Sequence, residues 1–165
     1  MKNFLGASHL PILAKVMDIS TGPVLEMGMG YYSTPFLYWK CKEQGRKLLS
    51  LEGDLIWMKK LEMPDFEGEG FNAVHVKDWD EADIDNTHWG VVLIDHRPAV
   101  RRRVDAKRLA NNADFVLMHD SEPEIDRFYR YGDAYKHFKY RYDYKSVGKP
   151  NTTVLSNFID LSKLG

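Results

Sequence analysis

Short apolar runs alternate with amphipathic segments along most of the chain. The apolar runs predict five strands, at 24–27, 47–52, 72–77, 89–95 and 114–120. The amphipathic segments have the apolar spacing of helices and lie at 8–19, 33–44, 55–61, 99–111 and 123–130. Strands that alternate with helices are joined by right-handed crossovers, so this pattern predicts a parallel sheet with helices on its faces.

The end of the chain has a different pattern. From Phe138 to Lys145 aromatic and charged residues alternate strictly, which predicts a strand with one aromatic and one charged face. A turn then leads to an apolar run at 152–156, and the two strands are expected to pair antiparallel. We therefore predict one α/β domain over 1–165, a three-layer sandwich with a helix within 1–20, a mostly parallel seven-stranded sheet and a terminal β-hairpin at 136–158.

Capping residues mark the ends of the first two predicted helices. Ser8 is in position to cap the first helix, and Ser33 or Thr34 to cap the second. Pro35 suits the first turn of the second helix, and Gly45 is expected to end it.

Composition and charge mainly exclude classes of protein. Hydrophobic residues make up 44% of the 165 residues, enough for a core, and the formal net charge of -1 gives no bulk attraction to nucleic acid or to an anionic membrane. The single cysteine, Cys41, excludes a disulfide within the chain. No apolar run approaches the ~20 residues that span a bilayer, and the N-terminus lacks a signal core, so we expect a cytoplasmic protein.

Polar residues recur at the carboxyl ends of the predicted strands. They are Glu26 and Gly28, Glu52, Lys77 and Asp78, Asp95, and His119 and Asp120. Open α/β sheets bind ligands at this edge, near the point where the strand order reverses. We therefore expect the functional site there.

A glycine turn, Gly28-Met29-Gly30, follows the first strand and its terminal acid, Glu26. Glycine permits a tight turn and lets a ligand approach the backbone closely. Ser33 stands where a dinucleotide-binding fingerprint has its third glycine, which disfavours a nicotinamide-dependent oxidoreductase. A plain strand-to-helix turn is the alternative, although Glu26 at the end of a buried strand is unusual for one.

Glu52 ends the second strand, where a carboxylate can accept hydrogen bonds from two ribose hydroxyls. Asp78 and Trp79 follow the third strand and offer an acceptor and a stacking face to an adenine. The alternatives are a helix-start acid at Glu52 and a surface acid beside a partly buried tryptophan.

The segments 24–35 and 49–54 together resemble the first two binding motifs of the class I S-adenosylmethionine-dependent methyltransferases, and the terminal hairpin is similar to the ending of that fold. The resemblance implies a Rossmann-like fold and methyl transfer from S-adenosylmethionine. It implies that Gly28 and Gly30 pass beside the methionine part, that Glu52 holds the ribose and that Asp78 lies near the adenine. The full set of expected cofactor-binding residues is Glu26, Gly28, Gly30, Ser33, Glu52, Asp78, Trp79 and Asp95.

The sequence departs from that family between the third and fourth strands. Only Trp79 to His88 intervene, where many members have a helix and more chain, and large substrate-recognition insertions are absent. The acceptor site must therefore be built from loops, from the N-terminal helix or from a second subunit of a homo-oligomer.

Methyl transfer needs a positioned acceptor and, for a hydroxyl, a base. The catalytic candidates are Asp95, His96, His119 and Asp120, with His9 a weaker one. Asp95 and Asp120 also offer oxygen ligands to a divalent cation, and the His119-Asp120 pair resembles the strand ends at which some O-methyltransferases of this fold hold Mg²⁺. The alternatives are a structural acid at Asp95 and a hydrogen-bonded histidine at His119.

Basic residues crowd the predicted helix at 99–111, and we expect most of them, namely Arg101, Arg102, Arg103, Lys107 and Arg108, on a solvated face. Arg97 lies closest to the predicted site and is the candidate for binding an acidic group of the acceptor. Aromatic and basic residues also interleave from Tyr129 to Tyr144, as in surfaces that stack nucleobases, but the strict alternation favours a buried strand face.

These inferences favour an enzyme, an S-adenosylmethionine-dependent methyltransferase that acts on an oxygen of a small-molecule acceptor. Two alternatives stay open: a regulatory or non-catalytic module that binds S-adenosylmethionine, and methylation of a macromolecule. Asp95-His96-Arg97-Pro98 does not match the Asp/Asn-Pro-Pro-aromatic motif of amino-methylating nucleic-acid enzymes. Together with the formal net charge of -1, this leads us to expect no nucleic-acid partner, and the net charge likewise argues against a membrane partner.

Overall fold

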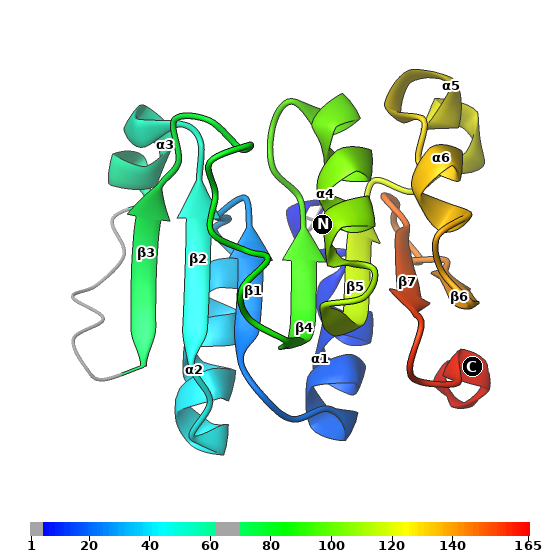
Figure 1. Ribbon diagram of the computed structural model, residues 1–165, viewed down its shortest axis with the longest axis horizontal. Helices are drawn as coiled ribbons and strands as arrows, with labels where there is room; N and C mark the ends of the chain where they lie inside the picture. Colours follow the sequence, from blue (N-terminus) through cyan, green and yellow to red (C-terminus); the bar gives the residue numbers. More distant parts are fainter. Residues whose placement is uncertain (1–4, 62–69) are drawn as a thin grey trace.

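The computed structural model describes residues 5–61 and 70–165 of the chain. Within these residues one sheet contains β1 (Val24–Met27), β2 (Leu48–Glu52), β3 (Phe71–His75), β4 (Trp89–Ile94), β5 (Ala113–His119), β6 (Tyr140–Tyr144) and β7 (Thr152–Ser156). The strand order is β3-β2-β1-β4-β5-β7-β6 (Figure 1). Strands β1 to β5 are parallel, whereas β7 runs antiparallel to both β5 and β6. The predicted mostly parallel seven-stranded sheet with an antiparallel terminal hairpin is confirmed.

Helices cover both faces of the sheet, with α1 and α2 behind it and α4 in front in Figure 1. The α-helices are α1 (Leu10–Ile19), α2 (Ser33–Gln44), α3 (Leu55–Lys60), α4 (Arg102–Leu109), α5 (Asp126–Tyr129) and α6 (Gly132–Tyr135). The 3-10 turns are η1 (Leu5–Ala7), η2 (Ala99–Arg101), η3 (Pro123–Ile125) and η4 (Leu161–Leu164). In the described part of the chain, none of these helices has the length and apolar character needed to cross a membrane.

Alternation along the central strands divides the core into two layers. On β4, Val92 and Ile94 enter the front layer with α4, whereas Val91 and Leu93 enter the back layer with α1 and α2. All four side chains are fully buried, as expected for a strand covered on both faces.

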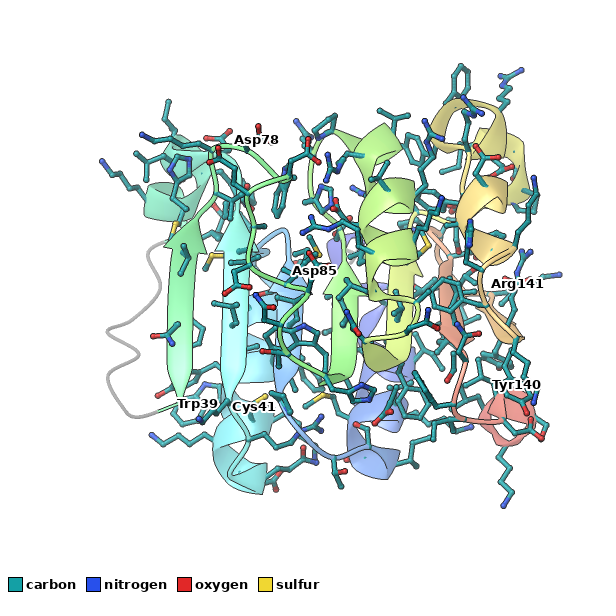
Figure 2. All side chains as sticks on the ribbon, in the orientation of Figure 1. Trp39, Cys41, Asp78, Asp85, Tyr140 and Arg141 are labelled. Atoms are coloured by element: carbon teal, nitrogen blue, oxygen red, sulfur yellow. The ribbon has the colours of Figure 1, made fainter. Side chains whose placement is uncertain are left out.

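The front layer over β1 is covered by an irregular segment, residues 76–88, which joins β3 to β4 without a helix. Trp79, Ala82 and Ile84 of this segment are buried in the front layer. Arg108 of α4 holds it, because its guanidinium donates to the carbonyls of Trp79 (2.8 Å) and Ala82 (3.0 Å) and pairs with Asp85. Figure 2 shows Asp85 in front of β1. The short connection predicted from the sequence is therefore confirmed.

The basic side of α4 is not the solvated face that we expected. Arg101 pairs with Asp80 of segment 76–88 (2.8 Å) and with the buried Asp105 (3.0 Å). Arg102 is buried, and Arg108 anchors segment 76–88. The prediction is wrong for these three arginines because carboxylates and carbonyls of neighbouring elements lie within reach of their side chains.

Both predicted helix caps are wrong. Helix α1 begins at Leu10 after η1, and neither the Ser8 hydroxyl nor the N-cap residue His9 makes a side-chain cap bond. Helix α2 begins at Ser33, but the Thr34 hydroxyl accepts from the Gly30 amide (2.9 Å) and donates to Glu26 (3.0 Å). The Thr34 hydroxyl therefore binds the buried Glu26 and does not cap the helix. Gly45 ends α2 at φ +65, as predicted.

Several other boundaries shift. The predicted helix at 99–111 is η2 followed by α4, and the one at 123–130 is η3 followed by α5. Helix α6 was not predicted, because Gly132 at its first position has low helix propensity. The third and fifth strands span 71–75 and 113–119, so Lys77, Asp78 and Asp120 lie beyond strand ends.

Candidate functional site

The strand order reverses between β1 and β4. From β1 the chain proceeds outward to β2 and β3, and then returns to β4 and continues to β5 on the other side. The Gly28 amide donates to the Leu51 carbonyl (2.8 Å), and the Asp95 amide donates to the Met27 carbonyl (2.8 Å). Ligands of open α/β sheets bind at such a switch point. The predicted glycine turn and Asp95 meet at this point.

Gly28 has a conformation and surroundings that exclude a side chain. Its φ is +96, and a Cβ built on it would lie 2.6 Å from both the Asp95 carbonyl carbon and the His96 nitrogen. Glycine is therefore required both for the dihedral angle and for the close approach of the turn to the end of β4.

Glu26 lies beneath the turn. It is fully buried, and its carboxyl accepts hydrogen bonds from the hydroxyls of Ser50 (2.6 Å) and Thr34 (3.0 Å). Burial raises the pKa of Glu26 to about 7, although hydroxyl donors, including Ser33, oppose the shift. Glu26 and the buried Ser33, both predicted cofactor contacts, therefore lie under the turn as supports.

Glu52 lies beside the turn. Its side chain accepts from the Met29 amide (2.9 Å) and the Asp54 amide (2.8 Å), one bond to each carboxylate oxygen. Each oxygen retains acceptor capacity for a further donor. Trp57, which the sequence analysis did not select, donates its indole N–H to the Met29 carbonyl (2.8 Å) from the other side.

Asp78 and Trp79 have different environments. Asp78 is exposed at the carboxyl edge of the sheet (Figure 2). Trp79 is buried: its ring stacks on His96 at 4.1 Å, and its indole N–H donates to the Arg97 carbonyl (3.0 Å). One face of the Trp79 ring is thus covered by His96.

His96 lies apart from the other catalytic candidates. Its Nε2 is 3.0 Å from an Asp105 carboxylate oxygen, and both side chains are fully buried. Burial alone would raise the pKa of Asp105, but the neighbouring His96 and the hydrogen bonds from Arg101 outweigh it, so this pKa lies below its usual range. The structure therefore places His96 in the front core layer and does not bring it to the carboxyl edge.

Arg102 joins the ends of β4 and β5. Its guanidinium pairs with Asp95 (2.9 Å) and Asp120 (2.9 Å), and its Nε donates to the His96 carbonyl (2.7 Å). This role of Arg102 was not predicted from the sequence. The spacing along the helix could have indicated it, because Arg102 lies on the same side of α4 as the buried Ala106 and Leu109.

His119, Asp120 and His9 form the other half of the site. His119 is buried, with its Nδ1 3.1 Å from the Thr152 hydroxyl and its Nε2 3.8 Å from Asp120 Oδ1. The ring of His9 contacts that of His119 edge-on at 4.8 Å. The pKa of His9 is lowered to about 3, mainly by burial and to a smaller extent by the neighbouring His119. Burial also raises the pKa of Asp95, although Arg102 opposes the shift.

Two cavities flank Asp120. One, of about 640 Å³, is lined by Arg97, Pro98, Ala99, Arg102, Asp120 and Tyr129. The other, of about 210 Å³, shares Asp120 and Tyr129 and extends toward α5 and α6. A larger cavity of about 1220 Å³ lies at the opposite edge of the sheet around Arg46, and none of the predicted site residues lines it. Because predicted site residues line the two cavities at Asp120, we take these two as the candidate ligand site.

The metal prediction gains no support from this arrangement. Over residues 5–61 and 70–165, no group of three or more His, Cys, Asp and Glu side chains is placed to hold a metal ion. Arg102 also occupies one oxygen of Asp95 and one of Asp120, the two predicted ligands.

No protein-family model and no curated protein matches the chain, whereas solved structures do. Spermidine synthase in complex with the transition-state analogue AdoDATO superposes with a TM-score of 0.72 at 14% identity, over 99% of this chain and 64% of that one. Spermidine synthase from Thermotoga maritima gives 0.66 at 15% identity, over 99% and 63%. Human methyltransferase-like protein 13 in complex with SAH gives 0.63 at 12% identity, over 95% and 80%.

These similarities define the fold. The chain has the Rossmann-like α/β fold found in a methyltransferase-like protein and in the spermidine synthases, so the fold implied by the sequence resemblance is confirmed. The chain spans less than two thirds of the length of either spermidine synthase.

Proposed function

We propose that the chain is an S-adenosylmethionine-dependent methyltransferase that methylates an oxygen of a small-molecule acceptor. The fold supports the general part of this proposal. The observation that carries it is the meeting of Gly28, Glu52 and Asp95 at the switch point of the sheet.

The residues at the switch point fit the cofactor. Gly28 keeps the turn free of side chains, and Glu52 is oriented by two backbone amides while retaining acceptor capacity for two ribose hydroxyls. In this proposal Gly28 and Gly30 pass beside the methionine part, Glu52 binds the ribose and the exposed Asp78 lies near the adenine.

The sulfonium of the bound cofactor supplies an activated methyl group, so the protein has to position the acceptor and remove its proton. Asp120 lines both cavities and its side chain is 28% exposed. We assign Asp120 to accept the hydroxyl proton of the acceptor; S-adenosylmethionine, when bound, would supply the methyl group and leave as S-adenosylhomocysteine. His119 and Arg102 position the Asp120 carboxylate, and Arg97, exposed on the wall of the 640 Å³ cavity, is the proposed contact for an acidic group.

Calorimetric titrations with S-adenosylmethionine and with NAD test the cofactor. We expect binding of the first alone, and no binding of S-adenosylmethionine would refute the proposal. Glu52→Gln keeps the size of the side chain but removes its charge, and should weaken binding by about tenfold or more. Glu43→Gln, at an exposed position on α2, is the control and should leave affinity unchanged.

Measuring the rate of methyl transfer as well as the affinity for S-adenosylmethionine distinguishes a residue of the chemical step from one that only binds the cofactor. Asp120→Asn should lower the rate of methyl transfer far more than the affinity for S-adenosylmethionine, because it removes the proton acceptor, leaves Gly28 and Glu52 unchanged and retains an amide oxygen that can accept from Arg102. Equal effects on rate and affinity would remove Asp120 from the chemical step.

A further inference from the structure

We propose that the 210 Å³ cavity beside Asp120 binds a protonated amine, so that the acceptor of the methyl group carries an ammonium group. The identification of the ligand as the acceptor rests on the proposed function, whereas binding of an amine does not. Carboxylates and aromatic faces on the walls support the proposal.

Three carboxylates line the cavity, from Asp120, Glu122 and Asp126. Asp120 pairs with Arg102, which it shares with Asp95, and Asp126 accepts from the Gly132 amide (2.9 Å) through one oxygen. Glu122, the third acid, has a donor for one carboxylate oxygen only, among the described residues.

Glu122 is 7% exposed. Its Oε1 accepts from the Asn151 amide (3.0 Å), but its buried Oε2 has no hydrogen-bond partner in the described part of the chain. The buried hydroxyl of the adjacent Ser121, on the same wall, likewise has none among those residues. A buried carboxylate oxygen without a donor is costly, and an ammonium group supplies up to three donors and the opposite charge.

Tyrosine rings form the rest of the wall. Tyr129 and Tyr131 have ring centroids 5.5 Å apart, and Tyr135 packs edge-on against Tyr131 at 6.4 Å. The Tyr131 hydroxyl is already used, because it donates to the His119 carbonyl (3.0 Å). The faces of such rings attract cations.

Arg141 shows that this wall accepts a cation. It is the one Arg or Lys among the described residues lining the cavity, and its guanidinium lies 3.9 Å from the centroid of the Tyr135 ring. Its charge is balanced by Asp143 (2.9 Å), and it lies on the outer strand β6 (Figure 2). Its ion pair is therefore with Asp143 and not with Glu122 or Asp126, whose carboxylates accept from backbone amides.

The two cavities share Asp120 and Tyr129. An acceptor that spans both would place its ammonium group near Glu122 and its reacting oxygen beside Asp120. The acceptor class that fits this geometry is a small aliphatic or aromatic amine that also carries a hydroxyl.

Calorimetry with 1,4-diaminobutane and with 1,4-butanediol, each with and without S-adenosylhomocysteine, tests the site. The diamine should bind, and the uncharged diol should bind at least about tenfold more weakly. Glu122→Gln keeps an acceptor for the Asn151 amide and should weaken diamine binding by about tenfold or more. Glu124→Gln makes the same charge change two residues away on a 61% exposed side chain outside the cavity, and should change binding less than about twofold.

Each result bears on a different claim. Equal binding of diamine and diol, or equal losses in Glu122→Gln and Glu124→Gln, would overturn the amine site. S-adenosylhomocysteine binding without diamine binding would overturn the amine site and leave the proposed function standing. Diamine binding without S-adenosylhomocysteine binding would support the site and refute the proposed function. If Glu122→Gln does not fold, Asp126→Asn serves in its place, because its amide carbonyl still accepts from Gly132.

Discussion

Replacing Arg102 with methionine tests how the ends of β4 and β5 are held together. Methionine retains much of the buried aliphatic stem but removes the guanidinium that contacts Asp95, Asp120 and the His96 carbonyl. Two carboxylates and several carbonyls then lose their donor at once.

The magnitude follows from burial. Removing one partner of a fully buried ion pair costs about 3–5 kcal/mol. Here Arg102 is nearly fully buried, but the Asp95 and Asp120 side chains are 32% and 28% exposed, so water can partly solvate the remaining charges. We therefore expect a loss near the lower limit, about 3 kcal/mol of unfolding free energy.

Urea unfolding at pH 7 measures the loss, and Arg103→Met is the matched control. Arg103 is the next residue on α4, and its 27% exposed side chain pairs with the surface residue Asp133. Its replacement should cost less than about 1 kcal/mol.

The pH dependence gives a second check. Burial already raises the pKa of Asp95, and loss of Arg102 should raise it further. A raised folded-state pKa adds stability below the unfolded-state pKa, and this stability is lost as pH rises through the folded-state value. The deficit of Arg102→Met should therefore shrink toward pH 4, and a deficit below about 1 kcal/mol or one independent of pH would refute the reasoning.

Three further changes test other parts of the structure. Gly28→Ala should cost more than Gly45→Ala, whose Cβ meets nothing within 4 Å, because the Cβ at Gly28 would meet backbone at 2.6 Å; equal costs in urea unfolding would contradict the geometry. The pKa of Glu26, raised to about 7, should add stability below pH 4.5 that is lost as pH rises through 7, up to about 3 kcal/mol. Glu26→Gln should abolish that slope, and an unchanged slope would assign it elsewhere. The pKa of His9, lowered to about 3, should add stability above pH 6.5 that is lost as pH falls toward 3, so His9→Gln should unfold less readily in acid, and acid unfolding at the wild-type pH would count against this.

Local patterns predicted the fold well because most of its elements have a strong signal of their own. The buried strands β4 and β5 appear as continuous apolar runs, and β6 as an alternation of aromatic and charged residues. The glycine turn was recognisable because the φ of Gly28 and the contact with β4 both require glycine. Such features depend on residues that are close in sequence, or on a position where only glycine fits.

The roles of side chains at the site were harder to predict, because they depend on contacts between distant elements. Asp95 and His96 are adjacent in sequence, yet Asp95 pairs with Arg102 near the carboxyl edge while His96 turns into the front layer toward Asp105. Arg102 looked like one of several surface cations, since only the packing of α4 on the sheet reveals the carboxylates that it contacts.

Residues 76–88 cover the front of β1 without belonging to any strand or helix. A covering helix would carry its own ladder of backbone hydrogen bonds in addition to its contacts with the sheet. This segment depends on Arg108 and on the burial of Trp79, Ala82 and Ile84, so undocking removes its shape as well as its contacts. It should therefore behave as a separate cooperative unit whose amide protons exchange together, ahead of those in the sheet beneath it. Access to the inner side of the switch point would then be governed by local unfolding rather than by the movement of a rigid body.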